Sequence, residues 1–452
     1  MTNPKVKLLS HASILIEVDG KKIITDPWYF GTAFNDGWEL SYKPDLDEIK
    51  AIITDVDIIW ISHEHPDHLH FPTLKWILEF AKKDVVVYFQ KNNSKKVFEA
   101  LRKLGFENFY EMQHLKKIPI SSDVQIMCYA HRHLDSCLGV FVREKFWLLN
   151  INDTELNAQD INIISKRFGA PYVLYNQFSI AGFDGIKCHL AANAKEVLEK
   201  MVEHHKLLKA SLTVPFASFV RFARKDNQFM NEFANTVFDA KEKFIVNNNK
   251  MLLQSIGGDY LEWQEVDQPA INGRNIDEQG VTYFSIPLEE HHDEHFYSVI
   301  KKDELKSVIE NRVDEWRNVT NKFLLNLFKL GSVKFCITDW DNEVWELNLK
   351  TFSFSESSEQ KFDISIASQP LHQAFKFPFG IQTLGVSGRY KMAAEYKELP
   401  ATWKKIRILS SLYNAEIFLS LKSFCSLKTL RWAWERRSGL MSQIFQQLKR
   451  FS

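Results

Sequence analysis

The sequence of 452 residues has few cysteines and no excess of either charge. Its five cysteines are scattered without a Cys-x-x-Cys pair, which excludes a disulfide framework and a thiolate zinc site as the organising feature. Lysine plus arginine equals aspartate plus glutamate at 57 each, so charge does not point to nucleic acid as a partner. The sequence contains no membrane-length apolar run and no signal-peptide-like start. We therefore expect a reduced, cytoplasmic protein without an integral membrane segment.

The length predicts more than one domain. Over residues 1–258, strand-like and helix-like segments alternate: "LLSHASILIEV" and "KKIITDPW" are joined by a hairpin signal, and "FPTLKWILEFAKK" has apolar residues at helical spacing. This alternation predicts an α/β fold in which sheets pack together under covering helices. We expect a mainly helical connector over residues 259–330, then a smaller α+β domain with a helical tail over residues 331–452.

A histidine-rich loop directly follows an apolar run. The stretch "DIIWISHEHPDHLHF" contains the pattern His-x-His-x-Asp-His, formed by His63, His65, Asp67 and His68. A loop that leaves a buried strand is held rigidly, so His63 and His65 can present imidazoles to one ion while Asp67 and His68 turn toward a second. Imidazole suits zinc or iron, and a carboxylate also makes iron or manganese acceptable. The pattern predicts a two-metal site, with a solvated loop as the alternative.

The same pattern resembles the metallo-β-lactamase superfamily, and neighbouring stretches narrow the resemblance. The segments "ITDPWYFGTAFNDGWEL", "ISHEHPDHLHFPTL", "HRHLDSCLGVF", "LLNINDTEL" and "VPFASFVRF" are similar to the metal-binding portion of CMP-N-acetylneuraminate hydroxylases and their bacterial relatives. This similarity extends over about residues 7–235. It implies an αββα sandwich with the metals at the edges of the sheets.

The resemblance also implies a ligand set, in which a third histidine from "YAHRHLDSC" completes the first metal site. The first ion would be held by His63, His65 and His131, the second by Asp67 and His68, with Asp153 bridging. His133 stays an alternative to His131, because residues two apart on a strand share a face. From the residues alone, an aspartate after "LLNIN" is more often a turn residue than a ligand.

Two residues near the start of the chain resemble supporting positions of the superfamily. Asp26 in "ITDPW" resembles an acid that orients a ligand histidine through its far ring nitrogen, and an Asp-Pro turn is the alternative. His11 lies in the family-like stretch "SHAS", where a core histidine is the alternative.

The chain departs from the family pattern after "PFASFVRF". The bacterial relatives usually carry a Ser-His pair where this sequence has Ala223 and Arg224. If that histidine completes the second site, the second ion is weak, absent or held differently. We expect Arg224 to meet a substrate phosphate or carboxylate in bidentate fashion. Trp28 and Trp38, in an unusually aromatic loop, are further candidate substrate contacts, with buried packing as the alternative.

A second departure concerns electron supply. The resembled hydroxylases carry a Rieske iron–sulfur module, which needs a Cys-x-His and a Cys-x-x-His pair. The sequence contains no Cys-x-His, and its single Cys-x-x-His, from Cys128 to His131, lies in a predicted strand. Oxygenase chemistry would therefore take electrons from a separate donor protein or reductant.

Two enzyme classes remain as candidate functions. The resemblance favours an iron-dependent hydroxylase, with Asp67, Asp153 and Asp26 as catalytic acids, acting on a sugar nucleotide or an N-acyl sugar precursor. The alternative is a zinc- or manganese-dependent hydrolase of an ester, lactone or phosphodiester. Near the C-terminus, "FGIQTLGVSGR" resembles part of a sterol-carrier-like domain, which would help to close a pocket or dimerise. The sequence does not determine the oligomeric state.

Overall fold

The computed structural model describes residues 3–91, 95–131, 135–254, 256–258, 260–264, 298–319 and 331–414. The alternative ligand His133, most of the predicted connector and the helical tail lie outside these residues. Within the described residues, no helix is both long enough and apolar enough to cross a membrane.

A seven-stranded sheet forms one half of the N-terminal sandwich, in the order β16-β1-β2-β3-β6-β7-β8. Its strands are β1 (Lys5–Leu8), β2 (Ile14–Val18), β3 (Lys21–Thr25), β6 (Ile58–Ile61), β7 (Val86–Gln90), β8 (Asn108–Met112) and β16 (Leu261–Glu262). The predicted hairpin joins β2 and β3 through Asp19 and Gly20, whose positive φ angles suit a tight turn. From β3 to β8 the strands are parallel, so the loops that follow them leave from one edge.

A six-stranded sheet forms the other half, in the order β14-β13-β12-β11-β10-β9. Its strands are β9 (Lys117–Pro119), β10 (Val124–His131), β11 (Asp135–Val142), β12 (Lys145–Asn152), β13 (Val173–Gln177) and β14 (Leu212–Phe216). A small third sheet, at the edge of the sandwich, consists of β4 (Thr32–Ala33), β5 (Trp38–Leu40) and β15 (Val220–Phe222).

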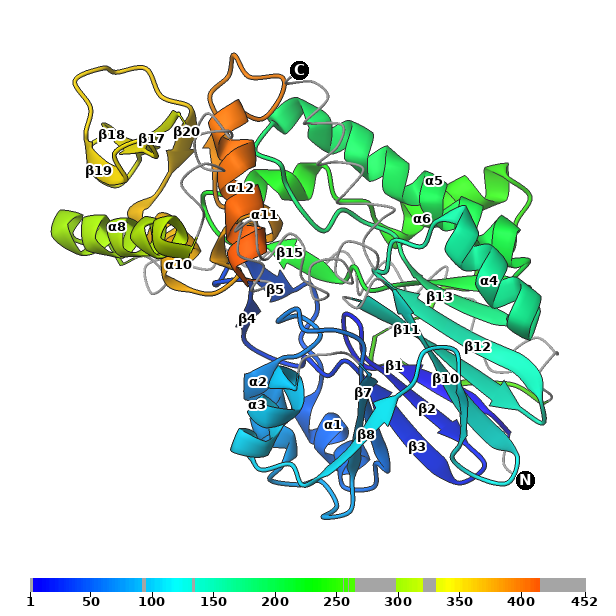
Figure 1. The fold of residues 1–452 in the computed structure, drawn as a ribbon. Helices are drawn as coiled ribbons and strands as arrows, with labels where there is room; N and C mark the ends of the chain where they lie inside the picture. The colour runs from blue at the N-terminus through cyan, green and yellow to red at the C-terminus, as the bar shows by residue number, and fades with distance from the viewer. Residues whose placement is uncertain are drawn as a thin grey trace.

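Helices cover the outer faces of the two large sheets, which gives the expected αββα layers (Figure 1). The helices of this part are α1 (Leu46–Ile53), α2 (Phe71–Ile77), α3 (Lys96–Leu104), α4 (Ala158–Phe168), α5 (Leu190–Leu208) and α6 (Val237–Val246), with short 3-10 turns at Lys187–His189 and Gln228–Glu232. The strand β6 explains the layering: Ile58 and Trp60 pack between the sheets, and Ile59 and Ile61 pack under α1 to α3. Apolar residues on both faces of a strand require cover on both sides.

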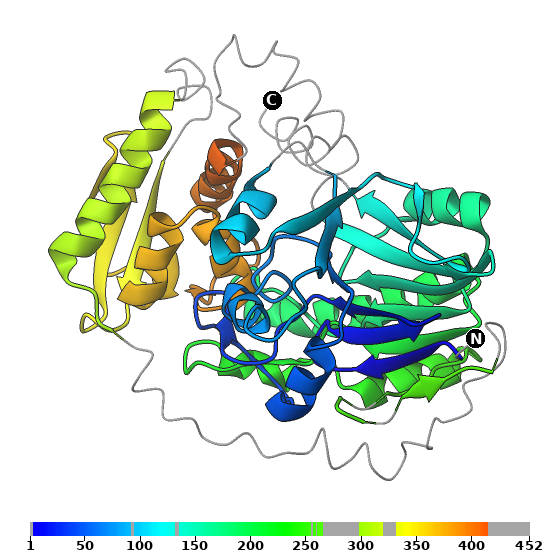
Figure 2. The ribbon, with the colours of Figure 1, turned by 90° about the horizontal axis from the view of Figure 1, so that it is seen from below.

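A smaller α+β domain follows, as the sequence predicts. Its sheet has the order β19-β18-β17-β20-β21, with β17 (Ser332–Ile337), β18 (Glu343–Asn348), β19 (Ser353–Glu356), β20 (Ile364–Ile366) and β21 (Lys391–Met392). Its helices are α8 (Lys302–Val319), α10 (Ser368–Lys376), α11 (Gly380–Ser387) and α12 (Ala401–Asn414). In both views α11 and α12 lie between this sheet and the sandwich (Figures 1 and 2).

The two parts share one hydrophobic cluster. It contains Trp28, Phe34 and Trp38 from the N-terminal part together with Leu384 and Trp403 from α11 and α12. Backbone hydrogen bonds cross the same contact: the Phe183 amide donates to Gly385 O and the Met392 amide to Gly185 O, each at 2.8 Å. The C-terminal domain is therefore packed against the sandwich, on the side where the small sheet lies.

This packing can be tested at Gly388, which has a φ of +69° and lies against Met230. A Cβ there would come within 2.3 Å of Met230 Sδ, whereas Gly20, at a φ of +71°, has nothing within 4 Å. We expect Gly20→Ala to lower the free energy of unfolding by about 1–2 kcal/mol, the cost of a left-handed residue with a Cβ. Gly388→Ala should lower it by about 1–3 kcal/mol more through overpacking. Urea unfolding measures both, and equal losses would mean that the Gly388 contact is absent in solution.

Candidate metal centre

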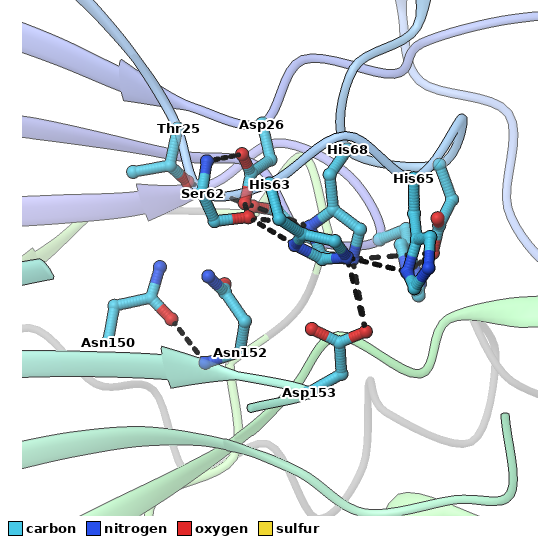
Figure 3. Close-up of polar contacts among 12 residues, drawn as sticks. Thr25, Asp26, Ser62, His63, His65, His68, Asn150, Asn152 and Asp153 are labelled. Atoms are coloured by element: carbon cyan, nitrogen blue, oxygen red, sulfur yellow. Dashed lines mark hydrogen bonds and ion pairs between the residues drawn. The ribbon is translucent and has the colours of Figure 1, made fainter. Parts of the chain in front are cut away.

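The buried carboxylate of Asp26 organises the histidine-rich loop. Asp26 follows β3, and the loop follows the neighbouring parallel strand β6. The Ser62 amide and hydroxyl each donate to Asp26 at 2.7 Å, and His68 Nδ1 lies 2.9 Å from its Oδ2 (Figure 3). Because Nδ1 of His68 is held by this carboxylate, Nε2 is turned away from it, toward Asp153.

One cluster of possible ligands consists of His63, His65 and Asp135, whose ligand atoms all lie within 4.8 Å of one another. His63 Nε2 lies 2.8 Å from His65 Nδ1 and 3.9 Å from Asp135 Oδ1. His63 and His65 come from the loop after β6, and Asp135 is the first residue of β11. Two imidazoles and one carboxylate therefore meet where the two large sheets end.

A second cluster, formed by His68, Asp153 and Asp67, lies next to the first. His68 Nε2 is 3.6 Å from Asp153 Oδ2 and 3.3 Å from Asp67 Oδ2. Asp153, directly after β12, also lies 3.7 Å from His63 Nε2, so its carboxylate reaches a residue of the first cluster. On the other side of Asp67, His11 Nε2 is 3.2 Å from Asp67 Oδ2, which adds a buried imidazole to the second cluster.

His131, which the resemblance suggests as third ligand of the first ion, is in neither cluster of the described residues. Its Nε2 lies 3.2 Å from Asp160 Oδ2. Asp160 belongs to the capping box of α4 and also accepts the hydroxyl of Tyr129, so it is fixed on the outer side of β10. Asp135, which pairs directly opposite His131 across β10 and β11, is the residue whose carboxylate lies beside His63 and His65.

The three predicted substrate contacts have internal partners. The indoles of Trp28 and Trp38 are buried and donate to Phe30 O and Val386 O. The Arg224 guanidinium is fully buried, and its Nη2 lies 3.0 Å from Glu39 Oε1. All three side chains are therefore occupied in packing the aromatic loop, and none presents a free face for substrate.

The two buried loop imidazoles have opposite protonation tendencies. Burial opposes the charge of His68, but the neighbouring carboxylates, first Asp67 and then Asp153, outweigh it and raise the pKa of His68 well above its ordinary value. For His63, burial and then the charge of His68 lower the pKa well below its ordinary value. His63 is therefore a neutral imidazole at neutral pH, the form that binds metals.

The carboxylates also differ. Burial raises the pKa of Asp67, but the adjacent His68 and His11 lower it well below its ordinary value. Burial likewise opposes ionisation of Asp153, and His63 and His68 reverse that effect and lower its pKa. Burial, with the nearby charge of Asp153, raises the pKa of Asp135 to about 6. All three are mainly ionised at neutral pH.

These charges fit divalent cations. Asp67, Asp135 and Asp153 are ionised at neutral pH and lie around the protonated His68, which concentrates negative charge at this largely buried place. Two carboxylates of the centre each have one buried oxygen without a hydrogen-bond partner among the described residues, Asp67 Oδ1 and Asp153 Oδ1. Unpaired buried charge is costly, so an arrangement of this kind is stabilised by bound cations. The donor set of nitrogen and oxygen atoms suits zinc, iron or manganese.

Comparison with known proteins finds similarity to one superfamily. Residues 5–143 match the family described as beta-lactamase superfamily domain, which confirms the predicted resemblance and the sandwich. Cytidine monophosphate-N-acetylneuraminic acid hydroxylase from Asterias rubens is 33% identical over 159 residues, which is 34% of this chain and 24% of that protein. The Danio rerio protein of the same name is 24% identical over 243 residues, 50% of this chain and 39% of that protein.

The chain thus matches only about a quarter to two fifths of the length of these relatives. Among solved structures, the metallo hydrolase Igni18 from Ignicoccus hospitalis aligns with a TM-score of 0.41 and 19% identity, over 58% of this chain and all of its own. The family match gives residues 5–143 the fold of an enzyme superfamily, and hydroxylases are among the relatives of this chain.

The placement of Asp135, and not His131, beside His63 and His65 leads to a direct prediction. Asp135→Asn removes the charge but keeps the shape, and we expect it to weaken binding of the first ion by at least about tenfold, the lower end of the loss seen for groups that only support ligands. His131→Gln should leave metal content unchanged. Elemental analysis of both variants after dialysis against limiting metal checks this, and loss of metal in His131→Gln alone would restore the ligand set suggested by the resemblance.

Proposed function

We propose that this protein is an iron-dependent hydroxylase that holds two metal ions at the described centre. Its first ion would be bound by His63, His65 and Asp135. Its second would be bound by Asp67 and His68, with His11 completing the set and Asp153 between the two ions. The substrate would be a sugar nucleotide or an N-acyl sugar precursor, and the electrons would come from a separate donor.

The observation that carries this proposal is the carboxylate in the first cluster. Two histidines and one carboxylate with open positions are typical of non-haem iron oxygenases, and some catalytic zinc sites use the same set. His63 Nε2 and Asp135 Oδ1 are 3.9 Å apart, a separation that an ion between them can span. The three carboxylates close to the imidazoles give the whole centre a hard, oxygen-rich character that favours iron or manganese.

The substrate class rests on the relatives. The two matched proteins are named as hydroxylases of cytidine monophosphate-N-acetylneuraminic acid, and the longer match extends over half of this chain. A sugar nucleotide or a related N-acyl sugar is the corresponding proposal for this protein.

Each residue of the centre would have its own task. Asp26 would hold His68 through Nδ1 and keep Nε2 directed at the ion. Asp67, which lies between His11 and His68, would orient a water or accept its proton. Asp153 would keep the two ions at a fixed separation. When bound, iron supplies the redox chemistry for O2, and zinc or manganese would supply Lewis acidity instead.

A hydrolase is the second candidate, and the second cluster favours it. Asp67, His68 and Asp153 are nitrogen and oxygen donors that zinc or manganese also accepts. With either metal the centre would cleave an ester, lactone or phosphodiester, and Asp67 would keep the same proton-handling task.

One purification distinguishes the two. The full chain is isolated anaerobically without added metal, and iron, zinc and manganese are measured per chain. We expect iron, with a change in the visible spectrum when O2 is added to the reduced protein. Zinc or manganese without a response to O2 would reject the hydroxylase in favour of the hydrolase, and no bound metal after reconstitution would reject both.

Variants connect the metal to these residues. We expect His65→Ala to lower the iron content and to abolish the response to O2, and Asp67→Ala to abolish the response even where some iron is retained. His189→Ala is the matched control, because this histidine is partly exposed and pairs with Asp184 outside both clusters. Wild-type behaviour of His65→Ala would remove the assignment of the first site.

A further inference from the structure

Three consecutive residues of the aromatic loop have left-handed backbones. Phe34, Asn35 and Asp36 have φ angles of 51°, 54° and 62°. Residues with a Cβ rarely adopt this conformation, because the Cβ approaches the following carbonyl oxygen. A run of three without glycine persists only where the surrounding structure holds it. We call residues 34–36 the left-handed turn.

Two buried arginines bind the carbonyl groups of this turn. Arg224 Nε donates to Asp36 O, and Arg389 Nη1 donates to Asn35 O at 3.1 Å. Both guanidinium groups are fully shielded from solvent. Arg389 also pairs through Nε with Asp226 at 3.0 Å, so its orientation is fixed from a second direction. The two arginines therefore oppose the relaxation of the strained backbone.

Arg389 belongs to the C-terminal domain, and the turn is in close contact with that domain. A Cβ on Gly37 would lie 2.7 Å from the Ser387 Cβ, at the end of α11. The Asn227 amide donates both to Gly37 O and to Ser387 O, at 2.8 and 2.7 Å. Strands β4 and β5, which flank the turn, lie next to α11 and β15 (Figure 1). The end of α11 thus forms part of the support of the turn.

The turn in its held conformation places an aromatic ring on the metal centre. The Phe34 ring centroid lies 5.8 Å from that of His65, at an interplanar angle of 64°. His65 is exposed, and within the described chain its one hydrogen-bonding neighbour is His63. His68, by contrast, has the Asp26 carboxylate on its second ring nitrogen. The ring of Phe34 is thus in edge contact with His65, whereas His68 is held by a carboxylate.

We propose that Arg389 is a positioning residue for the metal centre: together with Arg224 it holds the left-handed turn, which keeps Phe34 against His65. The C-terminal domain then supports the first metal site through this turn, without supplying a ligand. This inference rests on the proposed metal centre.

Cobalt(II) binding to the full-length apo-protein tests the inference without any substrate. Arg389→Lys keeps the charge near Asp226 but loses the planar fork that reaches two acceptors. We expect Arg389→Lys to weaken Co²⁺ binding about tenfold, as for other groups that orient a ligand, and to change the visible Co²⁺ spectrum. Arg389→Lys with wild-type affinity and spectrum would overturn the inference while leaving the metal centre intact. Absence of Co²⁺ binding by the wild type would remove the proposed function and this inference with it.

Arg312→Lys is the matched control. Arg312 lies in the same domain and also donates to backbone carbonyls, at 2.7 Å to Phe375 O and 2.8 Å to Lys376 O. It has no part in holding the turn, so we expect Arg312→Lys to leave Co²⁺ affinity and spectrum unchanged. Equal changes in the two variants would assign the effect to general loosening of the domain and would overturn the inference.

Two further variants address the turn itself. Asn35→Gly relieves the strain of one left-handed residue, and in the Arg389→Lys background we expect it to restore the wild-type spectrum in part. Phe34→Leu removes the ring on His65 directly and should reproduce the Arg389→Lys spectrum, even where Arg389→Lys itself does not fold. An unchanged spectrum in Phe34→Leu would overturn the inference.

Discussion

The metal centre depends above all on one buried carboxylate. Asp26 is fully shielded, and burial raises its pKa because a charge there is costly. The amide and hydroxyl of Ser62 and the ring of His68 offset that cost. These bonds tie the end of β3 to the beginning of the loop after β6, and they decide which nitrogen of His68 faces the ion. The positive φ of Asp26, 34°, shows that the backbone is strained to bring this carboxylate into place.

The charges of the groups around Asp26 and His68 depend on one another. Asp67 and Asp153 are kept ionised by imidazoles, and His68 is kept protonated by carboxylates, so each group depends on its neighbours. The charge of His68 alone is smaller than that of the three carboxylates Asp67, Asp135 and Asp153, and a bound cation would replace the proton at its Nε2. Folding of the two sheets therefore builds a site with a negative charge that is unfavourable without a cation. Because Asp153 reaches both clusters, the binding of one ion would also order the ligands of the other.

The sequence predicts that the histidine-rich loop follows a strand, and the structure has His63, His65, Asp67 and His68 directly after β6. A strand end at the edge of a sheet leaves such a loop little freedom. That Asp135 lies beside His63, while His131 lies beside Asp160, does not follow from the local pattern, because it depends on how β10 pairs with β11 and on the capping of α4 by Asp160. Likewise, aromatic composition alone does not reveal that the loop around Trp38 packs on residues almost 350 positions later. Such contacts are set by tertiary packing, and local sequence patterns carry no information about them.

The same long-range packing accounts for the aromatic loop. A loop with Trp28, Phe34 and Trp38 would be costly on a free surface, and here its rings are buried in a cluster shared with α11 and α12. Burial alone would allow many loop conformations, because apolar contact is not directional. The hydrogen bonds from Arg224, Asn227 and Arg389 to consecutive carbonyl groups select one of them. Apolar burial thus supplies the affinity between the two parts of the chain, and the buried donors supply the geometry. That geometry also fixes the place of Phe34, whose ring lies against the exposed His65.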